Sequence, residues 1–184
     1  RDGDSNHEGG FFQNKYAFQL GVKGKMDGWS YLIEYNQVQP YTYGHRTILQ
    51  NYSHMNQALA HPLGANFKEL VNIVEIKNGK WNYKMKAMFA HVGLDSLDTH
   101  YGQNIFETDY EASTGGQYSY GNFNGQGVAT NILSLQTEVS FTFKHFDVFG
   151  FVYYKKISSN LLDQNLLYFS LGLRTFPFSV FPDY

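Results

Sequence analysis

The feature that most constrains the fold of this chain is the strict alternation of apolar and polar side chains in several segments. In the last of them, LLYFSLGLRTF, one side carries Leu167, Phe169, Leu171 and Leu173, and the other side ends at Arg174. Successive side chains of a β-strand point to opposite faces, so such a segment has one apolar and one polar face. A helical period would mix charged and apolar residues on every face. The pattern therefore predicts strands.

Seven segments show this pattern or a variant of it. The predicted strands cover 15–26, 29–36, 67–77, 80–93, 131–144, 148–156 and a final segment from 166 onward. Asp27-Gly28 and Asn78-Gly79 are typical hairpin turns. In 67–77, Val71 and Ile73 share a parity with Glu69 and Glu75, which indicates a bulge or burial on both faces. A short helix is expected only around 55–60.

The connections between these strands alternate between short and long. One end of the predicted strands carries the long segments, which are residues 1–14, 37–66 and 94–130. The other end carries the tight turns, and Trp29 and Trp81 lie beside them. Outer-membrane barrels combine tight periplasmic turns, long outer loops and interfacial aromatic residues. The sequence thus predicts an all-β, antiparallel up-and-down transmembrane β-barrel in a bacterial outer membrane, with lipid as a partner. A soluble β-sandwich, which shows the same local alternation, is the alternative.

The parity of the strands adds an expectation about the whole protein. If the tight turns are periplasmic, the first of the seven predicted strands begins outside the cell and the last one ends in the periplasm. Single-chain bacterial barrels have an even number of strands. We therefore expect residues 1–184 to be one barrel segment, the C-terminal part of a larger barrel.

Composition narrows the function classes. A net charge of −2 gives no indication of a nucleic-acid partner, and the lack of cysteine removes disulfides and thiolate chemistry. No apolar run reaches the roughly 20 residues of a membrane helix. The mean hydropathy of −0.41 is compatible with barrel strands, whose apolar half is hidden by alternation.

The first long loop holds the candidate ligand-binding residues. These are polar and aromatic side chains close together in the sequence: His45, Tyr52, His54, Asn56, His61 and Asn66. The histidines are nine and seven residues apart with no carboxylate between them, which matches no usual metal-ligand pattern, so no metal is expected here. An ordered loop folded against the barrel mouth is the first interpretation. Contact with a saccharide or a protein partner is the second.

Charged residues on the polar parity would line the barrel interior. The main candidates are Glu34, Lys84, Lys86, Glu138 and Arg174, and others are Lys15, Lys23, Lys25, Glu69 and Glu75. Opposite charges on neighbouring strands can pair, and a wet interior lowers the cost of placing them there. A salt-bridged wall is the first interpretation, and a surface that holds a polar ligand is the second.

Two acidic segments and one aromatic segment complete the candidates. Asp2, Asp4 and Asn6 resemble the start of a calcium loop, but the bidentate Glu at its twelfth position is missing, so a flexible acidic loop is expected. The second long loop carries acidic residues that could bind calcium, although a solvated loop is the default: Asp95, Asp98, Glu107, Asp109 and Glu111. Residues 101–128 combine tyrosines with Gly and Asn, which suits contact with sugars. No nucleophile or phosphate-loop motif occurs, so neither an enzyme nor a cofactor is expected.

Two stretches resemble a known kind of protein. NYSHMNQALAHPLGANFKE, followed by a strand, a Trp-containing strand and YGQNIF, is similar to outer-membrane proteins of the Bacteroidetes, as is the closing SLGLRTFPF. These are capsule-assembly (Wzi-like) or gliding-motility outer-membrane proteins, which are longer than this chain. The resemblance covers roughly residues 41–106 and the C-terminus. It implies a barrel involved with surface polysaccharide or with the gliding and secretion machinery, and it supplies no catalytic residue.

Overall fold

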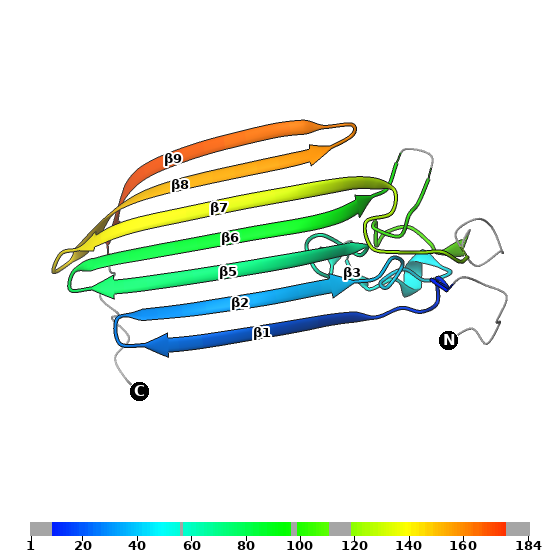
Figure 1. The fold of residues 1–184 in the computed structure, drawn as a ribbon, viewed down its shortest axis with the longest axis horizontal. Helices are drawn as coiled ribbons and strands as arrows, with labels where there is room; N and C mark the ends of the chain where they lie inside the picture. Colours follow the sequence, from blue (N-terminus) through cyan, green and yellow to red (C-terminus); the bar gives the residue numbers. More distant parts are fainter. Residues whose placement is uncertain (1–8, 56, 97–98, 111–118, 176–184) are drawn as a thin grey trace.

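A computed structural model describes residues 9–55, 57–96, 99–110 and 119–175. They form a seven-stranded antiparallel sheet in which each strand pairs with the next one along the sheet, in the order β1-β2-β5-β6-β7-β8-β9 (Figure 1). The strands are β1 (Ala17–Met26), β2 (Trp29–Val38), β5 (Phe67–Asn78), β6 (Trp81–Leu94), β7 (Val128–Thr142), β8 (Phe146–Ser159) and β9 (Asp163–Thr175). The prediction of an all-β antiparallel meander is confirmed.

The two ends of the sheet differ. At one end, here called the turn end, β1–β2, β5–β6 and β7–β8 are joined by tight turns (Figure 1). Gly28 and Gly79 have positive φ there, which is why glycine follows Asp27 and Asn78. At the other end, the loop end, residues 39–66 and 95–127 make the long connections. They include a 3-10 turn, Ile48–Gln50, and a two-residue pair, β3 (Ser53–His54) with β4 (Gln57–Ala58).

Three local expectations were wrong. The predicted helix at 55–60 overlaps the β3–β4 pair, where Met55 has positive φ. Of the two interpretations of the third strand, the bulge is wrong, because β5 pairs with β6 residue by residue from Phe67 to Asn78, and burial on both faces stays a prediction. The loop expected over 157–165, between the sixth and seventh predicted strands, is a tight turn between β8 and β9, in which the N–H of Ser159 donates to the carbonyl of Leu162. When one face of a strand is polar, polar side chains occur throughout the strand, so they do not show where the strand ends.

One face of the sheet, called the apolar face, carries large apolar side chains on every strand. The strand register places them side by side, and most are exposed. They form the apolar belt: Phe18, Leu20, Val22, Met26, Trp29, Tyr31, Ile33, Tyr35, Leu70, Val74, Ile76, Trp81, Tyr83, Met85, Ala87, Phe89, Leu133, Leu135, Val139, Phe141, Val148, Val152, Tyr154, Leu167, Phe169, Leu171 and Leu173. Among the described residues, no second large sheet exists to cover this belt.

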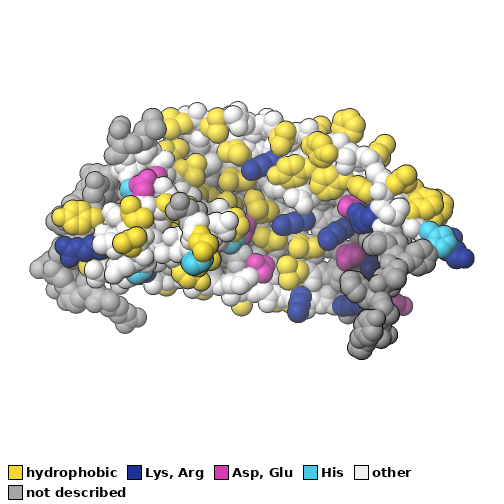
Figure 2. All heavy atoms as spheres, turned by 180° about the vertical axis from the view of Figure 1, so that it is seen from behind, with side chains coloured by type: hydrophobic (Ala, Val, Ile, Leu, Met, Phe, Trp, Pro, Cys, Tyr) yellow, Lys and Arg dark blue, Asp and Glu magenta, His cyan; other side chains and the backbone are white. Residues whose placement is uncertain are grey.

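The opposite face, called the charged face, is different in character. Lys, Arg, Asp and Glu side chains are spread along it (Figure 2). At its loop end, a small core of Val38, Phe67, Ala90, Val92 and Ile132 packs against Ala65 from the first long loop. The described parts of the long loops therefore cover one end of the charged face.

The two tryptophans beside the tight turns were expected at one level of the sheet, and this expectation is wrong by two residues. Trp29 pairs with Ile76, which pairs with Tyr83, so Trp81 lies two residues nearer to the turns. Both still belong to the turn-end border of the apolar belt. This border runs obliquely to the strands.

Among the described residues, no helix has the length and apolar character needed to cross a membrane.

Candidate functional site

The loop end of the sheet is capped by three chain segments that bind one another. The described residues within 9–16, 39–66 and 95–127, here called the cap, are linked by backbone and side-chain hydrogen bonds. Lys15 joins the first segment to the others, since its Nζ donates to the carbonyl of Gly44 at 2.6 Å and lies 2.5 Å from Asp109 Oδ2. Lys15 is thus a cap residue and not one of the charges along the sheet.

Asn51 and Gln103 hold the two long loops against each other. Asn51 Nδ2 donates to the carbonyls of Ile105 and Glu107 at 2.8 and 2.9 Å, and its Oδ1 accepts from the N–H of His45. Gln103 Nε2 donates to the carbonyl of Leu63 at 2.8 Å. Because buried backbone groups require partners, these amides give the loops a definite shape.

Asn66 is the most deeply buried polar residue of the cap. Its side chain is fully enclosed; Nδ2 donates to the carbonyls of Gly93 and Gln126 at 2.9 Å each, and Oδ1 accepts from the N–H of Gly125. Its φ is +59°, a conformation that Asn tolerates better than most residues. Asn66 therefore joins the two loops to the end of β6, and it presents no free group to a ligand.

Asp95, directly after β6, organises the second loop. Its carboxylate accepts hydrogen bonds from the backbone N–H groups of Tyr101 (2.5 Å) and Asn104 (2.8 Å), and at 3.4 Å from that of Gln103. A carboxylate that gathers several N–H groups shapes a loop in the way that a capping residue shapes a helix end. The side chain is only 12% exposed.

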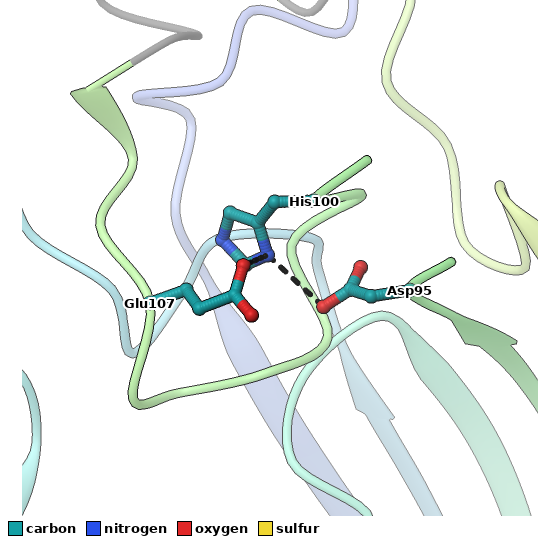
Figure 3. Close-up of side chains that lie close together, drawn as sticks. All are labelled: Asp95, His100 and Glu107. Carbon is teal, nitrogen blue, oxygen red and sulfur yellow. Dashed lines mark hydrogen bonds and ion pairs between the residues drawn. The ribbon is translucent and has the colours of Figure 1, made fainter. Parts of the chain in front are cut away.

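His100 and Glu107 meet the same carboxylate (Figure 3). His100 Nδ1 lies 3.0 Å from Asp95 Oδ2 and 3.3 Å from Glu107 Oε2. The His100 ring packs edge-to-face on Tyr41, whose hydroxyl donates to the carbonyl of His100. Two carboxylate groups thus converge on one imidazole nitrogen. Glu107 is half exposed, so solvent reaches this cluster from one side.

The pKa of Asp95 reflects these contacts. Burial raises the pKa of the carboxyl group, but hydrogen bonds from His100 and from the N–H groups of Asn104 and Tyr101 favour the charged form and prevail. The pKa is therefore lowered below its ordinary value of 3.8. Asp95 is ionised at neutral pH.

This lowered pKa predicts how the second loop responds to acid. A group whose pKa is lower in the folded state stabilises the fold above its ordinary pKa, and the contribution is lost as pH falls through the folded pKa. We expect the amide NMR shifts of Tyr101 and Asn104 to stay constant from pH 7 to about pH 4.5. They should then titrate with a midpoint below 3.8. Asp95→Asn should abolish the titration, and a midpoint above 3.8 would contradict the assignment.

The candidate ligand residues of the first loop are not brought together. No hydrogen bond, ion pair or ring contact joins any two of those that the structure describes. His45 and His54 are exposed, Tyr52 is exposed and stacks on Tyr43, and Asn66 is buried in its structural position. Asn56 lies outside the described residues. These residues therefore do not form one site.

Among the candidates that the structure describes, His61 reaches the charged face. Its ring stacks on Phe67 with centroids 4.5 Å apart, and its Nε2 lies 3.1 Å from Glu69 Oε2. Glu69 also accepts from Asn36 Nδ2, which donates to Glu34 as well. The cap is thus connected to the nearest charges of the sheet by a chain of polar contacts.

The five main charge candidates all lie on the charged face. The strand register puts Glu34, Lys84, Lys86, Glu138 and Arg174 on the same side of the sheet. Arg174 pairs with Glu138 at 3.0 Å and lies over the ring of Phe149. A cavity of about 510 Å³ lies between the ends of β1, β2, β5 and β6, lined by Lys23, Lys25, Lys84 and Glu75.

Sequence reasoning missed His100. Asp95 and Glu107 were grouped with other acidic residues as a solvated loop, and the histidine between them was not linked to them. Of those acidic residues, Asp109 binds Lys15 instead, and Asp98 and Glu111 lie outside the described residues, as do Asp2, Asp4 and Asn6. The sequence feature that could have indicated this cluster is the presence of two carboxylates and one imidazole within thirteen residues of a single loop.

Comparison with known protein families, curated proteins and solved structures finds no match to this chain. The resemblance to capsule-assembly and gliding-motility proteins therefore stays a prediction, based on the stretches in residues 41–106 and at the C-terminus.

Proposed function

We propose that this chain is part of the wall of a transmembrane β-barrel in a bacterial outer membrane. In this proposal the barrel serves surface-polysaccharide attachment or assembly, or the gliding and secretion machinery, and it catalyses no reaction. The observation that carries the membrane part is the apolar belt, which extends across all seven strands and remains exposed. Soluble monomers rarely expose a continuous apolar patch of more than a few hundred Å².

The height of the belt supports lipid as the solvent of this face. On β6 it begins at Trp81, and the first strongly polar residue on the same face is His91. Ten residue steps at about 3.3 Å cover about 33 Å along the strand. A strand tilted by about 40° then crosses about 25 Å, which is the height of the apolar band of outer-membrane barrels.

The two borders of the belt also suit a bilayer. Aromatic side chains occupy the turn end, including Trp29, Trp81, Tyr83 and Phe141, and the rings of Trp81 and Phe141 are 4.9 Å apart. Polar side chains border the loop end on the same face: Gln37, Lys68, His91, Asn131, Lys156 and Asn165. Aromatic residues prefer the interface between lipid and water.

The edges of the sheet define what must complete such a barrel. Within the described residues, β1 and β9 each pair on one side only, and both run from the loop end to the turn end (Figure 1). Joining β1 directly to β9 would create a parallel pair, and two copies inserted in the same orientation would also pair in parallel. All-antiparallel closure requires an odd number of further strands, because each edge must meet a strand of opposite direction.

The cap is the part that would face a saccharide or a protein partner outside the cell. It presents exposed aromatic side chains on an ordered scaffold, among them Tyr52, Phe106, Tyr110 and Phe123. Aromatic faces beside amide groups suit the apolar face and polar edges of a sugar ring. We expect Tyr52→Ala to weaken retention of the protein by immobilised surface polysaccharide. Tyr168→Ala, an equally exposed tyrosine on β9, is the matched control.

A gel experiment on the protein expressed from its own gene tests the membrane proposal. Folded barrels resist SDS and migrate differently until they are boiled, so the unboiled protein should shift in mobility and fractionate with outer membranes. A water-soluble species with no mobility shift would contradict the proposal. It would favour the alternative of a soluble carbohydrate-binding β-sandwich in which another sheet covers the apolar belt. Channel conductance or hydrolysis by the purified barrel would instead favour a pore or an enzyme acting on saccharide or lipid.

A further inference from the structure

The cap contains a compact group of three side chains that can each offer one ligand atom to a metal ion: Asp95, His100 and Glu107. One ligand atom from each lies within 4.8 Å of the others. The side chains of Asp95 and His100 are 12% and 11% exposed, whereas Glu107 is half exposed. Figure 3 shows both carboxylate groups directed at the same imidazole nitrogen. From this arrangement we infer that the cap binds a divalent transition-metal ion, Zn²⁺ in the first place, through Asp95, His100 and Glu107.

The separation of the ligand atoms fits such an ion. Zn²⁺ binds imidazole nitrogen and carboxylate oxygen at about 2.0–2.2 Å, so neighbouring ligands around a tetrahedral ion are about 3.3–3.5 Å apart. Nδ1 of His100 lies 3.0 Å from Asp95 and 3.3 Å from Glu107. The ligand atoms of Asp95 and Glu107 lie within 4.8 Å of each other. The half-exposed Glu107 side chain would therefore close toward Asp95 when the ion binds, and its exposed side leaves a fourth position for water.

The charges of the group suit a divalent cation. A neutral His100 offers a single N–H to two carboxylate groups and leaves two negative charges together. A protonated His100 balances only one of them and has a second N–H at Nε2, which is buried with no hydrogen-bond partner among the described residues. A divalent cation at Nδ1 leaves the same Nε2–H unpaired but balances both charges.

The surroundings hold the ligands in place without the ion. Asp95 is fixed by backbone N–H groups, and the backbone carbonyl of His100 accepts from Tyr41. Glu107 Oε1 accepts from Asn104 Nδ2 at 3.1 Å, which leaves Oε2 directed at His100. Such outer contacts orient ligands and commonly change metal affinity by 10- to 100-fold. The site offers one imidazole nitrogen and two carboxylate oxygens. Zn²⁺ binds both kinds of ligand, whereas Ca²⁺ takes oxygen ligands alone, so the site favours Zn²⁺.

Titration calorimetry with ZnCl₂ at pH 7 on the full-length protein in detergent tests this site. We expect one Zn²⁺ per chain, and an affinity at least tenfold lower for Glu107→Gln, a substitution at a half-exposed residue that leaves the Asp95 loop contacts in place. His54→Gln, which changes an exposed loop histidine elsewhere, should bind like the natural protein. Zn²⁺ should also slow amide exchange within 99–107 in the natural protein and not in Glu107→Gln.

Two results would overturn the inference. One is no Zn²⁺ binding by the natural protein. The other is binding that Glu107→Gln and His100→Gln leave unchanged, which would place the ion elsewhere. The site lies in the cap, so it does not depend on whether the sheet contacts lipid: failure of the membrane proposal would appear in the gel experiment, and failure of the metal site in the calorimetry.

Discussion

Leu135→Arg is expected to destabilise the protein by about 2–4 kcal/mol when it is folded in a lipid bilayer. Leu135 lies in the middle of β7, between Ala87 on β6 and Tyr154 on β8, at the centre of the apolar belt. An arginine there would place its charge near the middle of the hydrocarbon. The free energy of unfolding should be measured by guanidinium denaturation of the natural protein and the variant from phosphatidylcholine vesicles.

Gln136→Arg is the matched control, because Gln136 is the next residue of the same strand and points to the charged face. It lies opposite Lys86, and the like-charge contact costs at most about 1 kcal/mol. The difference in the free energy of unfolding between the two variants gives the cost of placing a charge on the apolar face rather than on the charged face. If Leu135→Arg and Gln136→Arg changed the stability equally, the apolar face would not be in contact with lipid.

Asn66→Ala is expected to destabilise the cap by about 3–5 kcal/mol. The substitution removes three hydrogen bonds of a fully buried side chain, two to the carbonyls of Gly93 and Gln126 and one from the N–H of Gly125. Alanine must also adopt the φ of +59° that Asn66 has, which adds about 1 kcal/mol. Amide exchange and protease sensitivity of residues 39–66 and 119–127 measure the result.

Two further variants separate the causes. Asn66→Gly relieves the backbone cost but not the lost hydrogen bonds, so it should recover only about 1 kcal/mol. Asn165→Ala removes an exposed asparagine that accepts from Tyr154 at 3.3 Å and should cost less than about 0.5 kcal/mol. A cap of unchanged protection in Asn66→Ala would show that the two loops are held together by other contacts.

The strands were predictable because their signal is local and repeated. Alternation in 15–26 or 80–93 depends only on each side chain's position in its own strand, and Asp27-Gly28 and Asn78-Gly79 indicate the turns directly. Both faces of the sheet follow from the same parity. The ends of β8 and β9 were less accessible, since the polar run 158–165 looks like a loop although most of it continues the ladder.

The contacts of the cap could not be predicted, because they join residues that are far apart in the sequence. Asn66 bonds to Gly125 and Gln126, about sixty positions away, and no local pattern distinguishes such an asparagine from a ligand-binding one. The six candidate residues of the first loop were grouped by their proximity in the sequence alone. His61 was brought to Glu69 by the packing of the loop on Phe67, which the sequence does not encode locally.

The sequence predicted the face of the sheet on which Arg174 and Glu138 lie, but not the ion pair that they form. The parity of Arg174 and Glu138 places both on the charged face, yet their ion pair crosses from β9 to β7, over the intervening strand β8. Long side chains can reach beyond the directly paired residue, so register alone does not define their partners.

The environment of the apolar belt is the central claim, and spin labels on β7 test it most directly. Single labels at each position from 133 to 141, in the protein folded in vesicles, would be probed with oxygen, which concentrates in lipid, and with a water-soluble nickel complex. We predict a period of two, with oxygen favoured at the odd positions Leu133, Leu135, Thr137, Val139 and Phe141, and the nickel complex favoured at the even positions. Uniform access of the nickel complex along β7, or burial of the odd positions from both reagents, would contradict a lipid-facing belt.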